Sequence, residues 1–244
     1  MLIFVKYAIF SDIHSNLEAL AAVLKDARER RVDAYICLGD IVGIGASPIE
    51  CIEILRNMNV SVVHGDYDLE VCDQGSQVKT SNRIQETLVW TRNQVSGSDI
   101  DWIRSHRREG SEKHFRYVHA SLNQIAPWQR LIAPMDASEH FDFQRESLCF
   151  VGHSHLQKIF QLDAISEELP FQNVIPNKKV KTVVSVGSVG RPQDNISDAA
   201  YVIYDSNQNI LWPLRVPYDV RSAQLKMKSA GFDIELIRSL AVGR

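Results

Sequence analysis

The stretch KYAIFSDIHSNLEALAAVLKDARERRVDAYICLGD, residues 6–40, holds two apolar runs that flank a helical pattern. Residues 6–11 and 33–39 are rich in the side chains that favour strands. Residues 16–31 place a set of apolar side chains on one helical face, with Asn16 suited to cap the first turn. That set is Leu17, Leu20, Ala21, Leu24 and Ala27. The order of these elements predicts βα units stacked on a sheet.

The alternation continues through the first half of the chain. A Ser-Pro pair at residues 47–48 predicts the start of a helix, and residues 60–65 predict a third strand. Residues 80–108 predict two helices, the second of them opened by Ser98 with Asp101 three residues later.

Short strands dominate the pattern from about residue 113 onward. Their sequences are HFRYVHA (114–120), SLCFVGH (147–153), KIFQL (158–162), KTVVSVG (181–187), AAYVIYD (199–205) and NILWPLRV (209–216). Residues 217–244 predict a helical tail of two helices separated by Gly231. Because we see no internal repeat, low-complexity tract or linker, we expect one domain over residues 1–244.

Composition narrows the class of protein. The 244 residues are 45% hydrophobic and 23% charged, which is typical of a soluble globular protein. With 27 basic and 30 acidic residues the net charge is −3, so a nucleic-acid partner is not indicated. No apolar stretch approaches the roughly 20 residues that span a bilayer, and the N-terminus lacks signal-peptide features. We therefore expect a cytoplasmic protein without a membrane partner.

Potential metal ligands stand where the predicted strands end. They are Asp12 and His14, Asp40, Asp66 with Asp68, His119, and His153 with His155. Because a crevice opens at the carboxyl ends of the strands in a layered α/β fold, we expect these side chains to converge. Three carboxylates and four imidazoles suffice for two adjacent ions. A ligand set of oxygen and imidazole without thiolate favours Mn, Fe, Zn, Ni or Co.

Five ordered motifs carry a resemblance to the calcineurin-like metallophosphoesterases. They are SDIHSN (11–16), CLGDIVG (37–43), HGDYD (64–68), YVHAS (117–121) and VGHSH (151–155). The later segment VVSVGSVGRPQD (183–194) and the helical tail are similar to those of bacterial members. The resemblance implies a four-layer αββα sandwich, in which two mixed β-sheets are flanked by helices.

The resemblance also implies how the ligands divide between two divalent ions. Asp12, His14, Asp40 and His155 would hold one ion, and Asp40, Asp66, His119 and His153 the other. Asp40 would bridge the pair. The implied activity is hydrolysis of a phosphate ester by a metal-bridging hydroxide, as in a phosphodiesterase or a phosphatase. No phosphate-binding loop of the GxxxxGK type is present in the sequence.

Two residues of HGDYD depart from the family pattern. Asp66 stands where Asn is expected, and Tyr67 stands where His is frequent. The additional carboxylate should tighten metal binding and weaken the ions as Lewis acids. A phenol, with an ordinary pKa of about 10, donates a hydrogen bond well and gives up its proton reluctantly. Asp68 is expected either to orient neighbouring groups or to stabilise the turn.

The substrate is less closely defined by the sequence. Arg191 could reach a substrate phosphate, with Ser188 nearby, although a surface arginine after a turn is an equal alternative. We expect a small phosphate ester or nucleotide as substrate, and self-association is left open. The rival hypothesis is a protein of this fold that is catalytically weak or inactive and acts as a binding scaffold. A nuclease is a third hypothesis, without a visible basic groove.

Overall fold

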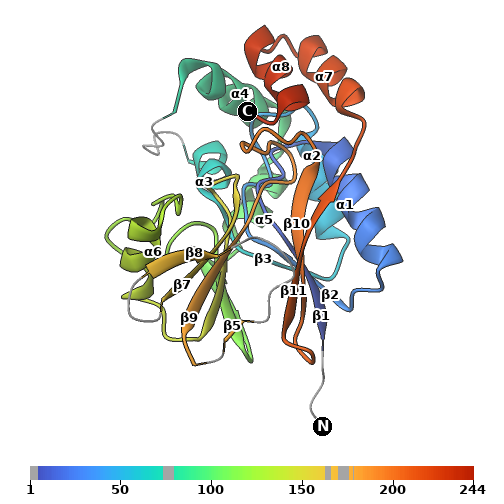
Figure 1. Cartoon of the computed structure of the whole chain (residues 1–244). Helices are drawn as coiled ribbons and strands as arrows, with labels where there is room; N and C mark the ends of the chain where they lie inside the picture. The colour runs from blue at the N-terminus through green and yellow to red at the C-terminus, as the bar shows by residue number, and fades with distance from the viewer. Residues whose placement is uncertain (1–4, 74–79, 163–165, 170–175, 178) are drawn as a thin grey trace.

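Two β-sheets face each other across an apolar interior in the computed structural model, which describes residues 5–73, 80–162, 166–169, 176–177 and 179–244 (Figure 1). The strands are β1 (Lys6–Phe10), β2 (Ala34–Cys37), β3 (Val60–Val62), β4 (Glu109–Glu112), β5 (Phe115–Val118), β6 (Leu148–Val151), β7 (Gln157–Leu162), β8 (Ser166–Leu169), β9 (Lys181–Val186), β10 (Ala199–Asp205) and β11 (Ile210–Val216). The helices are α1 (Leu17–Glu29), α2 (Pro48–Arg56), α3 (Asp66–Cys72), α4 (Asn82–Gln94), α5 (Gly97–Arg104), α6 (Pro134–Phe141), α7 (Val220–Ser229) and α8 (Ile234–Val242).

Both sheets mix parallel and antiparallel pairs. The first has the order β11-β10-β1-β2-β3, and β1, β2 and β3 run parallel while β10 runs antiparallel to β1. The second has the order β4-β5-β6-β9-β7-β8, and β5, β6 and β9 run parallel in its centre. The strands that precede the predicted ligands therefore point the same way within each sheet.

Alternation along the central strands builds three apolar layers. In β1, Ile9 faces the interior between the sheets, while Ala8 and Phe10 face the helices on the outer side. In β6, Phe150 faces the same interior and Cys149 packs outward on the side of α6. Because these strands are buried on both faces, their sequences read as continuous apolar runs.

Helices complete four layers and confirm the predicted αββα sandwich of mixed sheets (Figure 1). α1 and α2 cover the outer face of the five-stranded sheet, and α6 covers that of the six-stranded sheet. α7 and α8 form the expected pair after residue 217 and pack together near α4, at the top of the view. None of the helices in the described ranges is long and apolar enough to cross a membrane.

Several local predictions were wrong. On α1, Val23 is buried and Ala21 is exposed, so the buried face lies slightly around the helix from the expected one. Ser96 with Asp99, not Ser98 with Asp101, caps α5, because the Ser96 hydroxyl accepts a hydrogen bond from the Asp99 N–H. The helix α6 was not predicted, and HGDYD turns directly into α3.

Asn16 caps α1 as predicted and also ties two loops together. Its Oδ1 accepts a hydrogen bond from the Ala19 N–H at 3.1 Å, and its Nδ2 donates to the carbonyl of Gly190 at 2.8 Å. The side chain is buried. It therefore joins the loop after β1 to the loop after β9, next to the strand ends that carry the predicted ligands.

We expect Asn16→Ala to lower the free energy of unfolding by about 1–3 kcal/mol, because it removes both the cap and the bond to Gly190. Urea denaturation measures this loss. Asp219→Ala, which removes the exposed cap of α7 that accepts from the Ser222 N–H at 3.0 Å, serves as a matched control and should cost about 1 kcal/mol or less. Equal losses in the two variants would show that the bond to Gly190 contributes nothing.

Candidate metal centre

All seven predicted ligands come together at the carboxyl ends of the strands. Each follows β1, β2, β3, β5 or β6 within a few residues. They form two groups of neighbouring donor atoms: Asp12, His14 and His155, and Asp40, Asp66, His119 and His153. All seven side chains are buried except that of His153, which is partly exposed.

The first group joins the loop after β1 to the loop after β6. The Nε2 atoms of His14 and His155 lie 3.1 Å apart. Asp12 Oδ1 lies 3.3 Å from Nε2 of His155 and 3.7 Å from Nε2 of His14. Three donor atoms thus face one another at short range.

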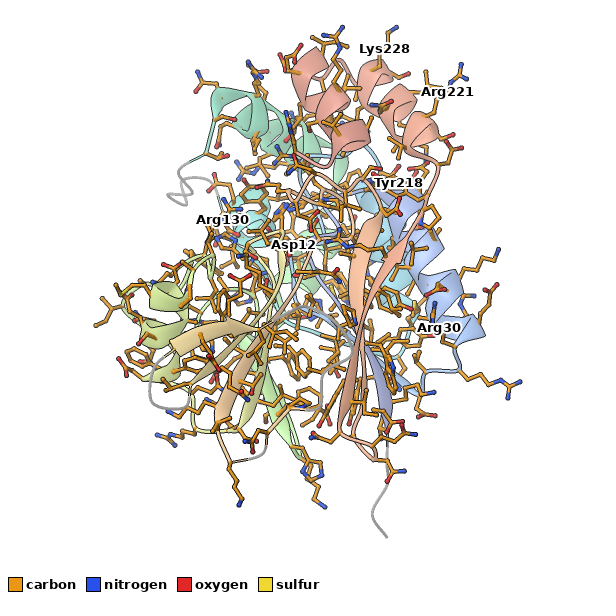
Figure 2. The ribbon with its side chains drawn as sticks, in the orientation of Figure 1. Asp12, Arg30, Arg130, Tyr218, Arg221 and Lys228 are labelled. Atoms are coloured by element: carbon orange, nitrogen blue, oxygen red, sulfur yellow. The ribbon has the colours of Figure 1, made fainter. Side chains whose placement is uncertain are left out.

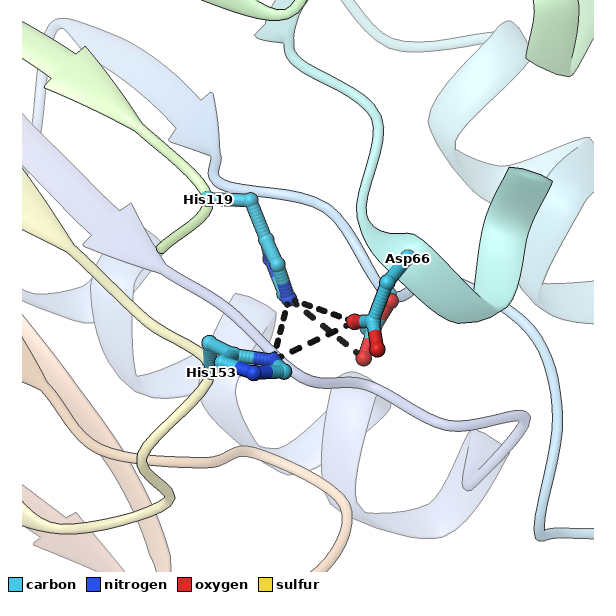
Figure 3. A group of neighbouring side chains, drawn as sticks. Asp66, His119 and His153 are labelled. Carbon is cyan, nitrogen blue, oxygen red and sulfur yellow. Dashed lines mark hydrogen bonds and ion pairs between the residues drawn. The ribbon is translucent and has the colours of Figure 1, made fainter. Parts of the chain in front are cut away.

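Figure 3 shows three members of the second group, Asp66, His119 and His153. His119 and His153 both point at the carboxylate of Asp66, whose Oδ1 is 3.3 Å from His119 Nε2 and 3.2 Å from His153 Nδ1. The two ring nitrogens are themselves 3.2 Å apart. These distances are those of donors that surround a common point.

Asp40 connects the two groups. Its Oδ2 lies 3.5 Å from His119 Nε2 in one group and 3.7 Å from His14 Nε2 in the other. Its Oδ1 accepts a hydrogen bond from the Tyr67 N–H at 3.0 Å. Gly65 permits this approach, because a Cβ there would lie 2.0 Å from Oδ1 of Asp40. The carboxylate is therefore fixed where it faces both groups.

The ligand-bearing loops adopt backbone conformations that L-residues rarely occupy. Five of the seven residues have a positive φ, between 48° and 60°. They are Asp12, His14, Asp40, His153 and His155. Each left-handed residue of this kind costs about 1–2 kcal/mol. Strain concentrated on these residues marks the loops as a functional site.

Backbone hydrogen bonds between loops hold this strained arrangement. The N–H of Asp12 donates to the carbonyl of Gly39 at 3.0 Å, and that of His14 donates to the carbonyl of Asp40 at 2.9 Å. The N–H of His153 donates to Oδ2 of Asp12 at 2.9 Å, which joins the two sheets. The ligands are thus positioned by their neighbours' main chains.

Two imidazoles are oriented by carbonyl groups behind them. His119 Nδ1 lies 2.7 Å from the carbonyl oxygen of Leu38, and His155 Nδ1 lies 2.6 Å from that of Arg191. Since a carbonyl only accepts, the Nδ1–H of each ring must donate. When either ring is neutral, its lone pair is then on Nε2, which faces the carboxylates, as in the histidine ligands of metal proteins.

Asp68 stabilises the turn at the start of α3, where Asp66 lies. Its Oδ2 accepts from the Gly65 N–H at 3.0 Å at the start of α3, and its Oδ1 accepts from the Ile41 N–H at 2.8 Å and the Val42 N–H at 3.2 Å. Both alternatives expected for Asp68 are combined in these bonds, since it stabilises the turn and also holds the loop after β2. Burial raises its pKa to about 6.

The carboxylates of the cluster differ in their affinity for protons. Burial opposes ionisation of Asp12 and Asp66, but the facing imidazoles hold the pKa of each well below the ordinary value. Burial, with the neighbouring Asp66 carboxylate, raises the pKa of Asp40 well above its usual range. Burial disfavours charge on His119, yet the facing Asp40 carboxylate raises its pKa well above normal. Burial lowers the pKa of His14 to about 4, so its ring is neutral at pH 7.

The donor set fits divalent ions. Two ligands that are each about 2.1 Å from an ion lie about 3.0–3.4 Å apart in octahedral or tetrahedral arrangements. The separations within each group reach from 3.1 to 3.7 Å. Asp12 Oδ1 and Asp66 Oδ1 are buried and have no hydrogen-bond partner among the described residues. Imidazole and carboxylate donors without thiolate suit the metals expected from the sequence.

A pocket of about 610 Å³ opens beside the cluster. Asp40, Asp66, His153 and His155 line its floor, and Tyr67, Trp128, Arg130 and Arg191 are among the residues of its walls. The Tyr67 hydroxyl lies 3.2 Å from Oγ1 of Thr80, and burial raises its pKa to about 12. The ring therefore keeps its proton at neutral pH.

Arg191 lines this pocket, but Ser188 does not. The Ser188 hydroxyl is fully buried, donates to the carbonyl of Asp12 at 2.9 Å and accepts from the Arg191 N–H at 2.8 Å. It supports the loop of Arg191 instead of facing a substrate. Sequence reasoning missed Arg130, which stands in a segment without a recognisable motif.

A family model described as the calcineurin-like phosphoesterase superfamily domain matches residues 5–209. An uncharacterized protein of Methanocaldococcus jannaschii is 33% identical over 228 residues, which are 90% of this chain and 90% of that protein. The residues matched by the family model include all seven predicted ligands and the strands β1 to β10.

Two solved structures resemble the chain over nearly their whole lengths. A metallophosphoesterase from Sphaerobacter thermophilus has a TM-score of 0.87 and 28% identity, with 98% of this chain and 99% of that chain covered. A hypothetical protein from Pyrococcus horikoshii has a TM-score of 0.78 and 20% identity, with 100% and 99% covered, and so shares the fold.

We expect metal uptake to release protons and to tighten as pH rises. In the metal-free protein the raised pKa values of Asp40 and His119 keep protons on the cluster near pH 7. An ion that binds to these residues must displace those protons. Titration calorimetry with Mn²⁺ in buffers of different ionisation enthalpy should therefore count about one proton released or more.

Tyr67→Phe is the control for this proton count, because a phenol that stays protonated contributes nothing to it. Asp40→Asn should lower the count. An affinity for Mn²⁺ that stays constant from pH 6 to pH 8 would contradict the expected sharing of protons.

Proposed function

The chain belongs to the calcineurin-like phosphoesterase superfamily, and we propose that it is a dinuclear-metal-dependent hydrolase of small phosphate esters. The position of Asp40 carries this proposal, because one carboxylate oxygen faces donors of both groups at 3.5 and 3.7 Å. A single-ion site would not need that arrangement. Asp12, His14, Asp40 and His155 would hold one ion, and Asp40, Asp66, His119 and His153 the other.

Two bound divalent ions would neutralise charge on the phosphate oxygens and lower the pKa of an attacking water. The protein's own contribution is to keep the ligands in place. The carbonyls of Leu38 and Arg191 orient His119 and His155, and Asp68 holds the loop of Asp40 against the start of α3. Little side-chain movement is then required during the reaction.

Tyr67 would act on the leaving group as a hydrogen-bond donor. Tyr67 lines the pocket, and its ring packs on that of His14, with 5.3 Å between the ring centroids. Because its pKa is raised to about 12, it can donate a hydrogen bond to a departing oxygen but does not transfer its proton readily near pH 7. Substrates with stable leaving groups should therefore react best.

The pocket and the net charge favour a small substrate. The pocket has the volume of a ligand site, and the net charge of −3 does not favour a nucleic-acid partner. The rival proposal is a catalytically weak binding scaffold. The departures from the family pattern at Asp66 and Tyr67 support that rival. The enzyme is favoured because a full set of ligands and a pocket above them have been retained.

Metal-dependent turnover tests the proposal. Protein stripped with a chelator and reloaded with Mn²⁺, Ni²⁺, Co²⁺ or Zn²⁺ should hydrolyse bis-p-nitrophenyl phosphate or p-nitrophenyl phosphate. Asp40→Asn, which keeps the shape of the side chain and removes its charge, should lower kcat/KM by about 100-fold or more. Metal uptake without turnover above background would favour the scaffold instead.

We expect Asp66→Asn to raise kcat about tenfold and to weaken the apparent affinity for one of the two ions by a similar factor. The Asp66 carboxylate is ionised, since facing imidazoles hold its pKa well below normal, so the variant makes the site more positive by one charge. A more positive site shifts the acidic limb of the pH–rate profile to lower pH. Steady-state rates from pH 5 to pH 9 at several Mn²⁺ concentrations measure both effects, and an unchanged profile would contradict the charge argument.

A further inference from the structure

Two arginines line the pocket without a carboxylate to pair with. Within the described part of the chain, neither Arg130 nor Arg191 forms an ion pair with a carboxylate, whereas seven other arginines do. The Nε of Arg191 is buried and has no hydrogen-bond partner in the described ranges. Unpaired guanidinium groups that share one pocket repel each other, and a bound anion relieves that repulsion.

The arginines are held in place by the segments that carry the ligands. Arg130 Nη2 donates to the carbonyl of Ser154 at 2.7 Å and to Oε1 of Gln193 at 3.0 Å. The Gln193 N–H in turn donates to the carbonyl of His155 at 3.2 Å. His155 also donates through its ring to the carbonyl of Arg191. The guanidinium of Arg130 and the main chain of Arg191 are thereby fixed on the His155 side of the cluster.

Only one nitrogen of Arg130 is occupied by these bonds. Its Nε and Nη1 make no hydrogen bond to a described residue, and the side chain reaches toward solvent at the mouth of the pocket. Figure 2 shows Arg130 at the same level of the molecule as Asp12, above the strand ends. The free edge of the guanidinium is available to a group that extends from the cluster.

Charge counting separates the classes of substrate. Two divalent ions with the Asp12, Asp40 and Asp66 carboxylates leave one positive charge, and Arg130 and Arg191 add two more. A phosphodiester carries one negative charge, whereas a nucleoside diphosphate carries about three near neutral pH. The pocket therefore matches a substrate with a second anionic group better than it matches a simple diester.

The remaining wall suits a planar organic group. Trp128 is half-buried, lines the pocket and lies edge-on to His119, with 6.1 Å between ring centroids. Ile84 and Tyr67 line the pocket as well. A base or another flat ring can be accommodated beside these side chains.

We propose that Arg130 and Arg191 bind a second phosphate of the substrate, and that the preferred substrates are phosphoanhydrides, in which the leaving group is itself a phosphate, as in a nucleoside diphosphate. This inference rests on the proposed phosphoesterase function. Water adds to the terminal phosphorus, and the bond from that phosphorus to the bridging oxygen breaks. The products are inorganic phosphate, a nucleoside monophosphate and one proton.

Binding to the Mn²⁺-loaded protein tests the role of Arg130 separately from turnover. The probes are adenosine 5′-(α,β-methylene)diphosphate, which cannot be hydrolysed at its methylene bridge, and inorganic phosphate, which lacks the second group. We expect Arg130→Gln to weaken binding of the diphosphate analogue about tenfold or more by titration calorimetry, and binding of inorganic phosphate by less than about threefold.

Arg221→Gln is the matched control, because Arg221 is exposed on α7 and lies far from Arg130 (Figure 2). It should change neither affinity, and both variants should unfold at the temperature of the unaltered protein. Equal weakening of both ligands by Arg130→Gln, or weakening of neither, would overturn the inference.

Measurements of turnover distinguish failure of the second-phosphate site from failure of the proposed phosphoesterase function. Hydrolysis of p-nitrophenyl phosphate with no higher kcat/KM for ADP would reject the second-phosphate site and leave the phosphoesterase in place. If the metal-loaded protein hydrolysed none of p-nitrophenyl phosphate, bis-p-nitrophenyl phosphate and ADP, the proposed function would be rejected as well.

Discussion

Mutual repulsion among three buried carboxylates is the constraint on which this structure depends. Asp12, Asp40 and Asp66 are almost completely removed from water and face a shared space. Burying a charge is costly unless partners compensate it. Imidazoles compensate part of the cost, the backbone N–H groups of Tyr67 and His153 compensate another part, and cations would supply the remainder. The strained left-handed residues persist because the loops around them are bonded to one another.

The order of motifs allowed both the fold and the convergence of the ligands to be predicted. Apolar runs that end in Asp or His define strands whose carboxyl ends meet, so Asp12 and His153 could be placed together although 141 positions separate them. The left-handed backbone of these same residues could not be predicted, because it depends on hydrogen bonds from loops distant in sequence. The buried bonds of Ser188 have the same origin, and they explain why a serine beside Arg191 is not free for substrate.

The elements that escaped prediction are those whose partners are not local. α6 is short, and it is held by Phe141 and Ala137 against the outer face of β6 and β9. Arg130 precedes it in an irregular segment, so no periodicity or spacing identified it. Its position is determined by Ser154 and Gln193, which lie 24 and 63 residues away. Such a residue can be assigned to the pocket only from the three-dimensional arrangement of the loops.

The helical tail also contributes to the geometry of the cluster. Ile44, four residues after Asp40, has a positive φ of 63° and is buried against Met227 and Leu240 of the tail. At the far end of the tail, the carbonyl of Gly243 accepts a hydrogen bond from the Asn195 N–H, in the loop that follows Arg191. The tail therefore packs on the loop after Asp40 and on the loop after Arg191. Because both loops are covered by one helical pair, the spacing between cluster and arginines is set by the fold. A second phosphate attached to the reacting one has a fixed length, and a fixed spacing is what its recognition requires.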